Sequence, residues 1–341
     1  MSTRLLARAL AGLGLCVAAL SATAGPYSGL VVFGDSLSDS GNNALLLAPV
    51  FGGSLPPVVI PNDGFYSQIP STAGTYSNGM VWTQYLAQSL GVALAPSLAP
   101  GGTNFAFGGA QTGMDGSDIP AIPGFPFSMR TQVNSYLGAT SNLADPNALY
   151  VVAGGGNNIR AALEAMAVPG SDANAIAAAT ISSYATDMAG MVGSLRAAGA
   201  QHVLVLNTPN FGLTPLANAM GVSAQATGLS FAMDAALAGA LAGSGAQTFD
   251  MFSFMTGVVG AGAASGFSNW TNACGAAVNA CDVNTSLFWD GIHPTTLAHE
   301  QLAAAVLATV AVPEPDVAAL FAVGLVVVAL SRRRRARLHQ G

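Results

Sequence analysis

Short apolar runs alternate with longer helical stretches along the middle of this chain, and this alternation limits the fold more than any other feature. The runs 30–33, 148–153, 202–206 and 247–252 are short and rich in Val, Leu or Phe, as buried strands are. Helical segments are predicted at 80–90, 127–137, 173–198, 223–241 and 295–310. Strands that alternate with helices predict a parallel sheet covered on both faces, which is an α/β fold.

The N-terminal 24 residues have the pattern of a secretory signal peptide. Arg4 and Arg8 precede an apolar run, and Ala22-Thr23-Ala24 forms a small-x-small cleavage site before residue 25. A retained membrane helix is the alternative, but the run is too short to span ~30 Å of hydrocarbon comfortably. We therefore expect residues 1–24 to be removed on export.

The C-terminal segment 312–341 carries three features in a fixed order. Pro313-Glu314-Pro315 comes first, an uncharged run at 317–331 follows, and five arginines lie within 332–337. This order resembles the PEP-CTERM sorting signal of Gram-negative bacteria, which implies a transient membrane anchor, an exosortase-type processing enzyme as a partner, and a final location at the cell surface, on the outer-membrane side or outside the cell. A plain C-terminal membrane helix, with its positive charge left in the cytoplasm, is the alternative.

The charge of the remaining part, residues 25–311, excludes one class of partner. It contains no lysine, and its three arginines (Arg130, Arg160 and Arg196) stand against fourteen acidic residues, a formal net charge of −11. Nucleic-acid binding requires a basic stripe that complements phosphate, so we expect no nucleic-acid partner. The size of this part fits one large domain or two small ones.

Two cysteines remain in this part, Cys274 and Cys281, in a Gly- and Asn-rich loop. An even pair in an oxidising compartment predicts a disulfide. The histidines show no ligand spacing with either cysteine, so we expect no metal and no cofactor.

A serine stands where the first predicted strand ends, and an acid and a histidine follow far along the chain. Gly34-Asp35-Ser36-Leu37 comes directly after the apolar run 30–33, and Asp290-Gly291-Ile292-His293 lies about 250 residues later. Ligands of parallel sheets bind beyond the carboxyl ends of the strands, where Ser36 is expected. We predict Ser36 as nucleophile, His293 as general base and Asp290 as the carboxylate that orients the base, a set suited to cleaving esters. An ordinary turn that caps the last helix is the alternative for the second segment.

Four ordered motifs make the chain resemble the GDSL/SGNH hydrolase family across residues 29–311. They are Gly34-Asp35-Ser36-Leu37, Asn104 to Ala110, Gly155-Gly156-Asn157 and Asp290 to His293. The resemblance implies a flavodoxin-like, three-layer fold with a central parallel sheet, and esterase, lipase or acyltransferase chemistry. It also implies that the Ser36 N–H, the Gly109 N–H and the Asn157 amide donate to the oxyanion. Asn158 departs from the aspartate that the family more often has there, which removes an acceptor that could position Asn157.

Other prominent features have structural interpretations. We expect His202 and His299 to be structural, and Trp82 and Trp289 to serve packing. The Gly-, Pro- and Ser-rich stretches 46–78, 111–126 and 255–288 are predicted as loops that wall the substrate cleft, with a surface insertion as the alternative for the first.

Three functions fit the sequence. A secreted carboxylic ester hydrolase is favoured because every expected catalytic position is filled. An acyltransferase or a polysaccharide O-deacetylase on the same scaffold is a close variant. An inactive binding protein attached to the cell surface is the alternative from another class.

Overall fold

The computed structural model of this protein describes residues 27–56 and 65–310. The predicted signal peptide (1–24) and sorting segment (312–341) lie outside the described residues. Residues described up to Thr309 belong to one compact unit. None of the helices in the two described ranges combines the length and the apolar character needed to cross a membrane.

The centre of this unit is a four-stranded parallel sheet. Its strands are β1 (Leu30–Gly34), β2 (Leu149–Ala153), β3 (His202–Leu206) and β4 (Gln247–Phe249), and they lie in the order β1-β2-β3-β4. Every residue of β1 and β2 is buried, as expected of strands covered on both faces. The predicted α/β fold with a central parallel sheet is confirmed.

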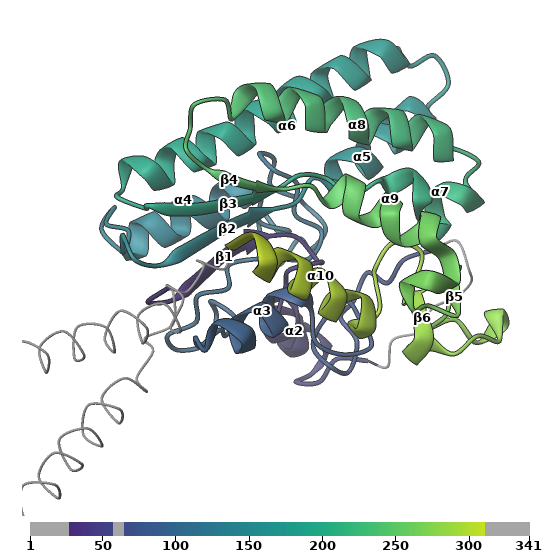
Figure 1. Cartoon of the computed structure of the whole chain (residues 1–341), viewed down its shortest axis with the longest axis horizontal. Coiled ribbons are helices and arrows are strands. Elements are labelled where there is room, and N and C mark those ends of the chain that lie inside the picture. The colour runs from purple at the N-terminus through teal and green to yellow at the C-terminus, as the bar shows by residue number, and fades with distance from the viewer. Residues whose placement is uncertain (1–26, 57–64, 311–341) are drawn as a thin grey trace, which may run out of the picture. The chain divides into compact units, whose positions relative to one another are not determined.

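Helices cover both faces of this sheet. Figure 1 shows α4, α5, α6 and α8 on one side and α3 and α10 on the other, which gives three layers. Phe33, Tyr150 and Val152 of the strands share one buried cluster with side chains of the first group of helices. The α-helices of the described part are α2 (Asn42–Leu47), α3 (Trp82–Leu90), α4 (Met129–Ala139), α5 (Gly156–Met166), α6 (Ala173–Ala197), α7 (Pro215–Ala219), α8 (Ser223–Ala240), α9 (Met251–Ala261) and α10 (Thr296–Val310).

The strand predicted at 247–252 is too long. The structure ends β4 at Phe249 because Asp250 begins helix α9: its carboxylate accepts a hydrogen bond from the Ser253 N–H at 2.9 Å. The side chain of Asn207 accepts from the Met251 N–H at 2.6 Å. The apolar residues Met251 and Phe252 are therefore helical, since apolar composition alone cannot separate a short strand from a helix start.

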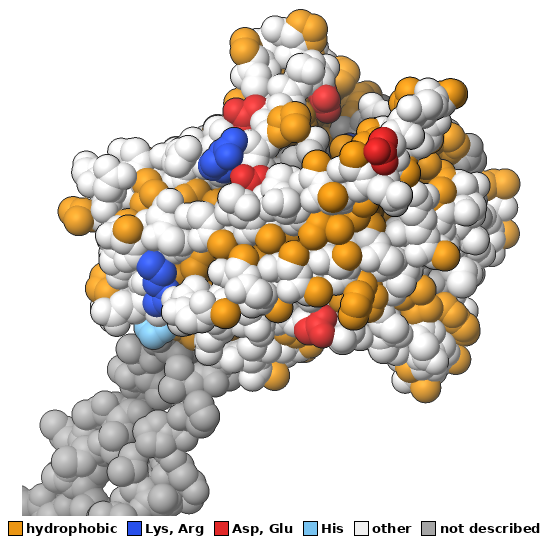
Figure 2. Space-filling view, turned by 90° about the horizontal axis from the view of Figure 1, so that it is seen from above, with side chains coloured by type: hydrophobic (Ala, Val, Ile, Leu, Met, Phe, Trp, Pro, Cys, Tyr) orange, Lys and Arg blue, Asp and Glu red, His pale blue; other side chains and the backbone are white. Residues whose placement is uncertain are grey.

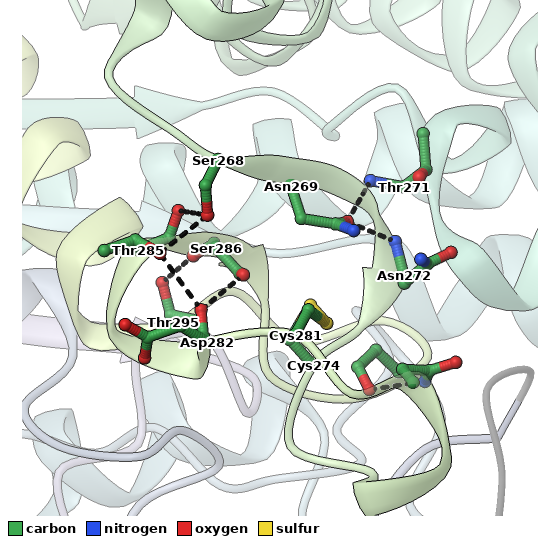
Figure 3. Close-up of a disulfide and its surroundings, with 12 residues drawn as sticks. Ser268, Asn269, Thr271, Asn272, Cys274, Cys281, Asp282, Thr285, Ser286 and Thr295 are labelled. Carbon is green, nitrogen blue, oxygen red and sulfur yellow. Dashed lines mark hydrogen bonds between the residues drawn. A yellow bond between two sulfur atoms is a disulfide. The ribbon is translucent and has the colours of Figure 1, made fainter.

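The stretch 255–288 was predicted as a loop, and this is wrong for much of its length. It contains the second half of α9 and a small parallel pair, β5 (Asn269–Ala273) and β6 (Ser286–Phe288). Figure 3 shows the Cys274–Cys281 disulfide in the connection that follows β5. Thr295 donates through its hydroxyl to the Ser286 carbonyl at 2.6 Å, and its N–H donates to the Leu287 carbonyl. Thr295 is thus bound to strand β6, which holds together the two ends of the segment 289–294.

The surface above α6 and α8 is weakly charged. Figure 2 shows scattered acidic and basic side chains among uncharged ones on this face, in line with a chain of which only 8% is Asp, Glu, Lys or Arg. Apolar side chains such as Phe231 are exposed there.

One buried carboxyl predicts an unusual pH dependence of stability. Asp234 on α8 accepts from the N–H and the hydroxyl of Thr208, each at 2.9 Å, while its Oδ2 has no partner in the described part of the chain. Burial raises the pKa of Asp234 to about 7 from 3.8. The folded protein therefore holds a proton that the unfolded chain loses near pH 4, and the free energy of unfolding falls as pH rises from about 4 to about 7.

In the Asp234→Asn variant, the free energy of unfolding should fall less steeply with pH, most clearly between about pH 6 and 7. Burial also raises the pKa values of Asp35 and Asp39, but only to about 6, so their part of the fall fades above pH 6 while that of Asp234 continues to about pH 7. Denaturant unfolding of wild type and variant between pH 4.5 and 8 measures the slopes. Equal slopes above pH 6 would show that Asp234 is ionised in the folded protein.

Candidate active site

Ser36 lies in a tight turn at the carboxyl end of β1. The Ser38 and Asp39 N–H groups both donate to the Asp35 carbonyl at 3.0 Å, which folds the chain back directly after the strand. Gln132 of α4 binds both the N–H and the carbonyl of Gly34, at 2.9 and 2.8 Å. The last residue of the strand is therefore fixed by a side chain, and Ser36 is placed beyond the edge of the sheet.

The three residues predicted as nucleophile, base and orienting carboxylate form a continuous row. His293 Nε2 lies 2.8 Å from Ser36 Oγ, and His293 Nδ1 lies 2.7 Å from Asp290 Oδ2. All three side chains are buried. This geometry allows the imidazole to take a proton from the hydroxyl while the carboxylate fixes its tautomer.

The Asp290 carboxylate is held in place from two directions. Oδ1 accepts from the N–H groups of Ile292 and His293, at 2.9 and 2.8 Å, which closes the turn between acid and base. Oδ2 accepts from the Ser67 N–H at 2.8 Å in addition to its contact with the imidazole. Four contacts on one fully buried carboxylate leave it one orientation. The contribution of Ser67 could not be predicted, because no motif marks it.

A tyrosine packs against the imidazole of His293. The ring of Tyr76 lies 5.1 Å from that of His293, centroid to centroid, with 36° between the planes. The Tyr76 hydroxyl accepts from the Asn43 side chain at 2.7 Å, and a Cβ added to Gly108 would lie 2.2 Å from the tyrosine ring. Tyr76 is thus fixed between the first and second motifs and limits the positions that the imidazole can take.

The three groups predicted as oxyanion donors line one cavity together with His293. Among the described residues, neither the Ser36 N–H nor the Gly109 N–H finds a hydrogen-bond partner. Asn157 uses one amide proton for the Ala110 carbonyl, at 3.0 Å, which leaves the other free to donate. Gly109 has φ +87°, and a Cβ there would lie 2.6 Å from Pro126, so only glycine fits.

Asn158 has a different role from its neighbour. Its carbonyl oxygen accepts from the Thr112 N–H at 3.1 Å, and its amide donates to the Thr112 hydroxyl at 3.0 Å. That hydroxyl in turn donates to Asp187 at 3.0 Å. Asn158 therefore holds the segment after Gly109 and Ala110 in place, and this explains why an amide, which both donates and accepts, suits the position.

Asp39 joins the first two motifs. Its carboxylate accepts from the N–H groups of Gly41, Asn42 and Asn43 within 3.2 Å and from the Gly108 N–H at 3.2 Å. Burial raises the pKa of Asp39 to about 6, against the lowering by these donors. The carboxylate fixes the glycine that precedes Gly109 relative to the nucleophile turn.

The cavity beside these residues has a volume of about 540 Å³ and a mixed lining. The stretch 46–78 contributes Phe51, Tyr66 and Gln68 to its wall, and 111–126 contributes Ile119 and Phe125. Two of the three stretches predicted as cleft walls thus line the cavity that Ser36 and His293 border. The third stretch, 255–288, does not line this cavity.

Two histidines expected to be structural lie outside this cavity. His202 begins β3 and packs edge-on against Tyr27. His299 is buried in α10, and burial lowers its pKa to about 3. The Trp82 indole is also buried and donates to the Ser38 hydroxyl at 3.2 Å, a packing role.

Comparison with known proteins gives related sequences. The family described as GDSL-like Lipase/Acylhydrolase matches residues 30–306. Lipase 1 of Photorhabdus luminescens is 36% identical over 203 residues, which are 60% of this chain and 25% of that protein. Esterase EstA of Pseudomonas aeruginosa is 33% identical over 161 residues, 39% of this chain and 22% of that protein. This chain thus spans a quarter or less of the length of these relatives.

A solved structure with a similar course of the chain is Axe2, an acetylxylan esterase from Geobacillus stearothermophilus. It superimposes with a TM-score of 0.44 at 12% sequence identity, over 85% of this chain and 97% of that one.

Proposed function

This chain belongs to the GDSL-like lipase/acylhydrolase family, and we propose that it cleaves carboxylic esters through an acyl-enzyme on Ser36. One observation carries the proposal. The hydrogen-bonded row Asp290–His293–Ser36 borders the same cavity as the three oxyanion donors. A nucleophile, its base and the donors for the developing charge can therefore act on one carbonyl group.

In the proposed first half-reaction, Ser36 Oγ attacks the ester carbonyl carbon while His293 Nε2 takes its proton. The carbonyl oxygen becomes an oxyanion that accepts from the Ser36 and Gly109 N–H groups and the Asn157 amide. The imidazolium, stabilised by Asp290, then gives the proton to the leaving alcohol as the C–O bond breaks. The products are the free alcohol and an ester between the acyl group and Ser36.

In the second half-reaction, water takes the place of the alcohol. His293 removes a proton from the water, the new tetrahedral centre collapses, and Ser36 leaves with that proton, which releases a carboxylic acid. A second alcohol in place of water would make the reaction an acyl transfer. The balance between the two depends on which acceptor reaches His293.

Covalent labelling tests this proposal directly. The mature domain should hydrolyse p-nitrophenyl acetate and lose this activity on treatment with a fluorophosphonate, and peptide mass spectrometry should place the adduct on Ser36. A label on another serine of an active preparation would overturn the assignment of the nucleophile. An inactive, unlabelled but folded domain would favour the alternative, a binding protein on this scaffold.

We further propose that the enzyme works outside the cytoplasm, after transient anchoring by residues 317–331. The motif order in 1–24 and 312–341 and the Cys274–Cys281 disulfide support this. The surface-exposed protein in its host should have the intact mass of a chain from which both terminal segments have been removed. A mass that still includes Arg332 to Arg335 would instead favour a permanent membrane anchor.

A further inference from the structure

A second, apolar pocket also borders Ser36. It has a volume of about 50 Å³ and shares Ser36, Asn157 and His293 with the large cavity. Apart from Asp35 and Thr214, the rest of its wall is apolar. The wall comes from the segments after β1, β2, β3 and β4 and from the end of β6 with the turn after it, and Leu37, Phe211, Met255 and Phe288 are among its members. The reactive hydroxyl therefore borders two spaces of different size and polarity.

We propose that the acyl group of the substrate occupies this apolar pocket, while its alcohol part, a polar polyhydroxyl group such as a sugar, lies in the large cavity. This assignment rests on the proposed ester hydrolysis and names the substrate class within it: esters of short acyl chains with polar alcohols. The acyl part of such an ester is apolar, like the small pocket, and its alcohol part is polar, like the wall of the large cavity.

The large cavity offers hydrogen-bonding groups suited to hydroxyls. Ser67, Gln68, Asp118 and Arg160 contribute to its wall. Arg160 lies on α5 one turn after Asn157, donates to the Tyr66 hydroxyl at 2.8 Å and pairs with Glu164 at 2.9 Å. Because this cation is already paired, the wall presents donors and acceptors without a strong net attraction for anions.

The small pocket limits the length of the acyl chain. Its volume of about 50 Å³ is less than a tenth of the volume of the large cavity. With the carbonyl carbon outside, at Ser36, a space of this size suits acyl groups of about two to four carbons. Longer chains would meet Met255 and Phe288.

Behind these two side chains lies a further apolar cavity of about 30 Å³. It shares Met251, Met255, Phe288 and Pro294 with the pocket beside Ser36, so these residues form the partition between the two. His299 also lines it, and burial lowers the pKa of that imidazole to about 3, so the cavity holds no charge at neutral pH. Met251 and Met255 are the two flexible members of this partition. Met255 lies inside α9, whereas Met251 is the first residue of that helix, so Met255 can be shortened with less risk to the helix start.

Met255→Ala should join the two spaces. On a series of p-nitrophenyl esters from acetate to decanoate, wild-type kcat/KM should fall beyond butanoate. The variant should shift its optimum by about two carbons and raise the octanoate-to-acetate ratio about 15-fold, because each newly buried methylene contributes about fourfold. Met255→Val, a milder truncation, should raise the octanoate-to-acetate ratio by a smaller factor. This variant replaces the alanine variant in the test if the latter does not fold.

Two control variants separate the possible outcomes. Met233→Ala makes the same truncation at a buried methionine of α8 and should leave the chain-length profile unchanged. Phe51→Ala, on the wall of the large cavity, should change the preference for the alcohol and not the acyl profile. An acyl profile that responds to Phe51→Ala and not to a folded Met255 variant would overturn the assignment. Absence of ester hydrolysis and of Ser36 labelling in wild type would instead contradict the proposed function itself.

Discussion

Replacing Ser36 with alanine is expected to lower the turnover of an activated ester by about 10⁴- to 10⁶-fold, since nucleophile, base and carboxylate act as a unit. The side chain makes one hydrogen bond, to His293 Nε2, so its loss leaves only that nitrogen, at the wall of the cavity, without its partner. We expect the variant to unfold at the same denaturant concentration as wild type, within error. Initial rates on p-nitrophenyl acetate and a denaturation curve measure the two quantities.

Ser38→Ala is the matched control for this experiment. Ser38 is buried, lies two residues further in the same motif and accepts from the Trp82 indole at 3.2 Å, but it does not line the cavity. Its loss should reduce stability by about 1 kcal/mol and leave turnover within a few fold of wild type. A Ser36→Ala protein that retains more than a hundredth of the activity would show that another group attacks the ester.

The second large effect is expected at Asn157. Asn157→Ala should lower kcat by about 100- to 1,000-fold with little change in KM, because the amide donates mainly to the transition-state oxyanion. Asn158→Ala should keep most of the turnover and instead lose stability, by about 1–3 kcal/mol, since the Thr112 N–H would be left unsatisfied. Steady-state kinetics and unfolding curves for both variants measure these effects. If Asn158→Ala gave the larger loss of kcat, the donor would be assigned to the wrong asparagine.

The strands of the central sheet and the candidate reactive groups could be predicted because each has a local signature. A strand buried on both faces is a continuous apolar run, and the nucleophile, base and acid lie in short motifs beside such runs. Helix α5 was not predicted, because it begins with Gly156 after two further glycines, a composition typical of a turn. The structure shows that Gly155, at φ +121°, makes the turn and that the helix starts directly after it.

The supporting contacts of the site could not be predicted, since they join segments far apart in the chain. Ser67 and Tyr76 come from a stretch rich in Gly, Pro and Ser, and nothing in their neighbourhood shows that one will bind Asp290 and the other will pack on His293. The apolar pocket could not be predicted from the sequence for the same reason. Its wall is assembled from five segments, and no single one carries a pattern that predicts a pocket.

The separation of nucleophile and base has a consequence for the time at which the enzyme becomes active. Ser36 and His293 are 257 residues apart, and the imidazole is held by the last strand and the turn before the final helix. At about 5–20 residues per second, a ribosome completes the second partner roughly 13–50 s after the first. During this interval the nascent chain carries the serine without its base, so the capacity to react with esters arises only when almost the whole domain has been made.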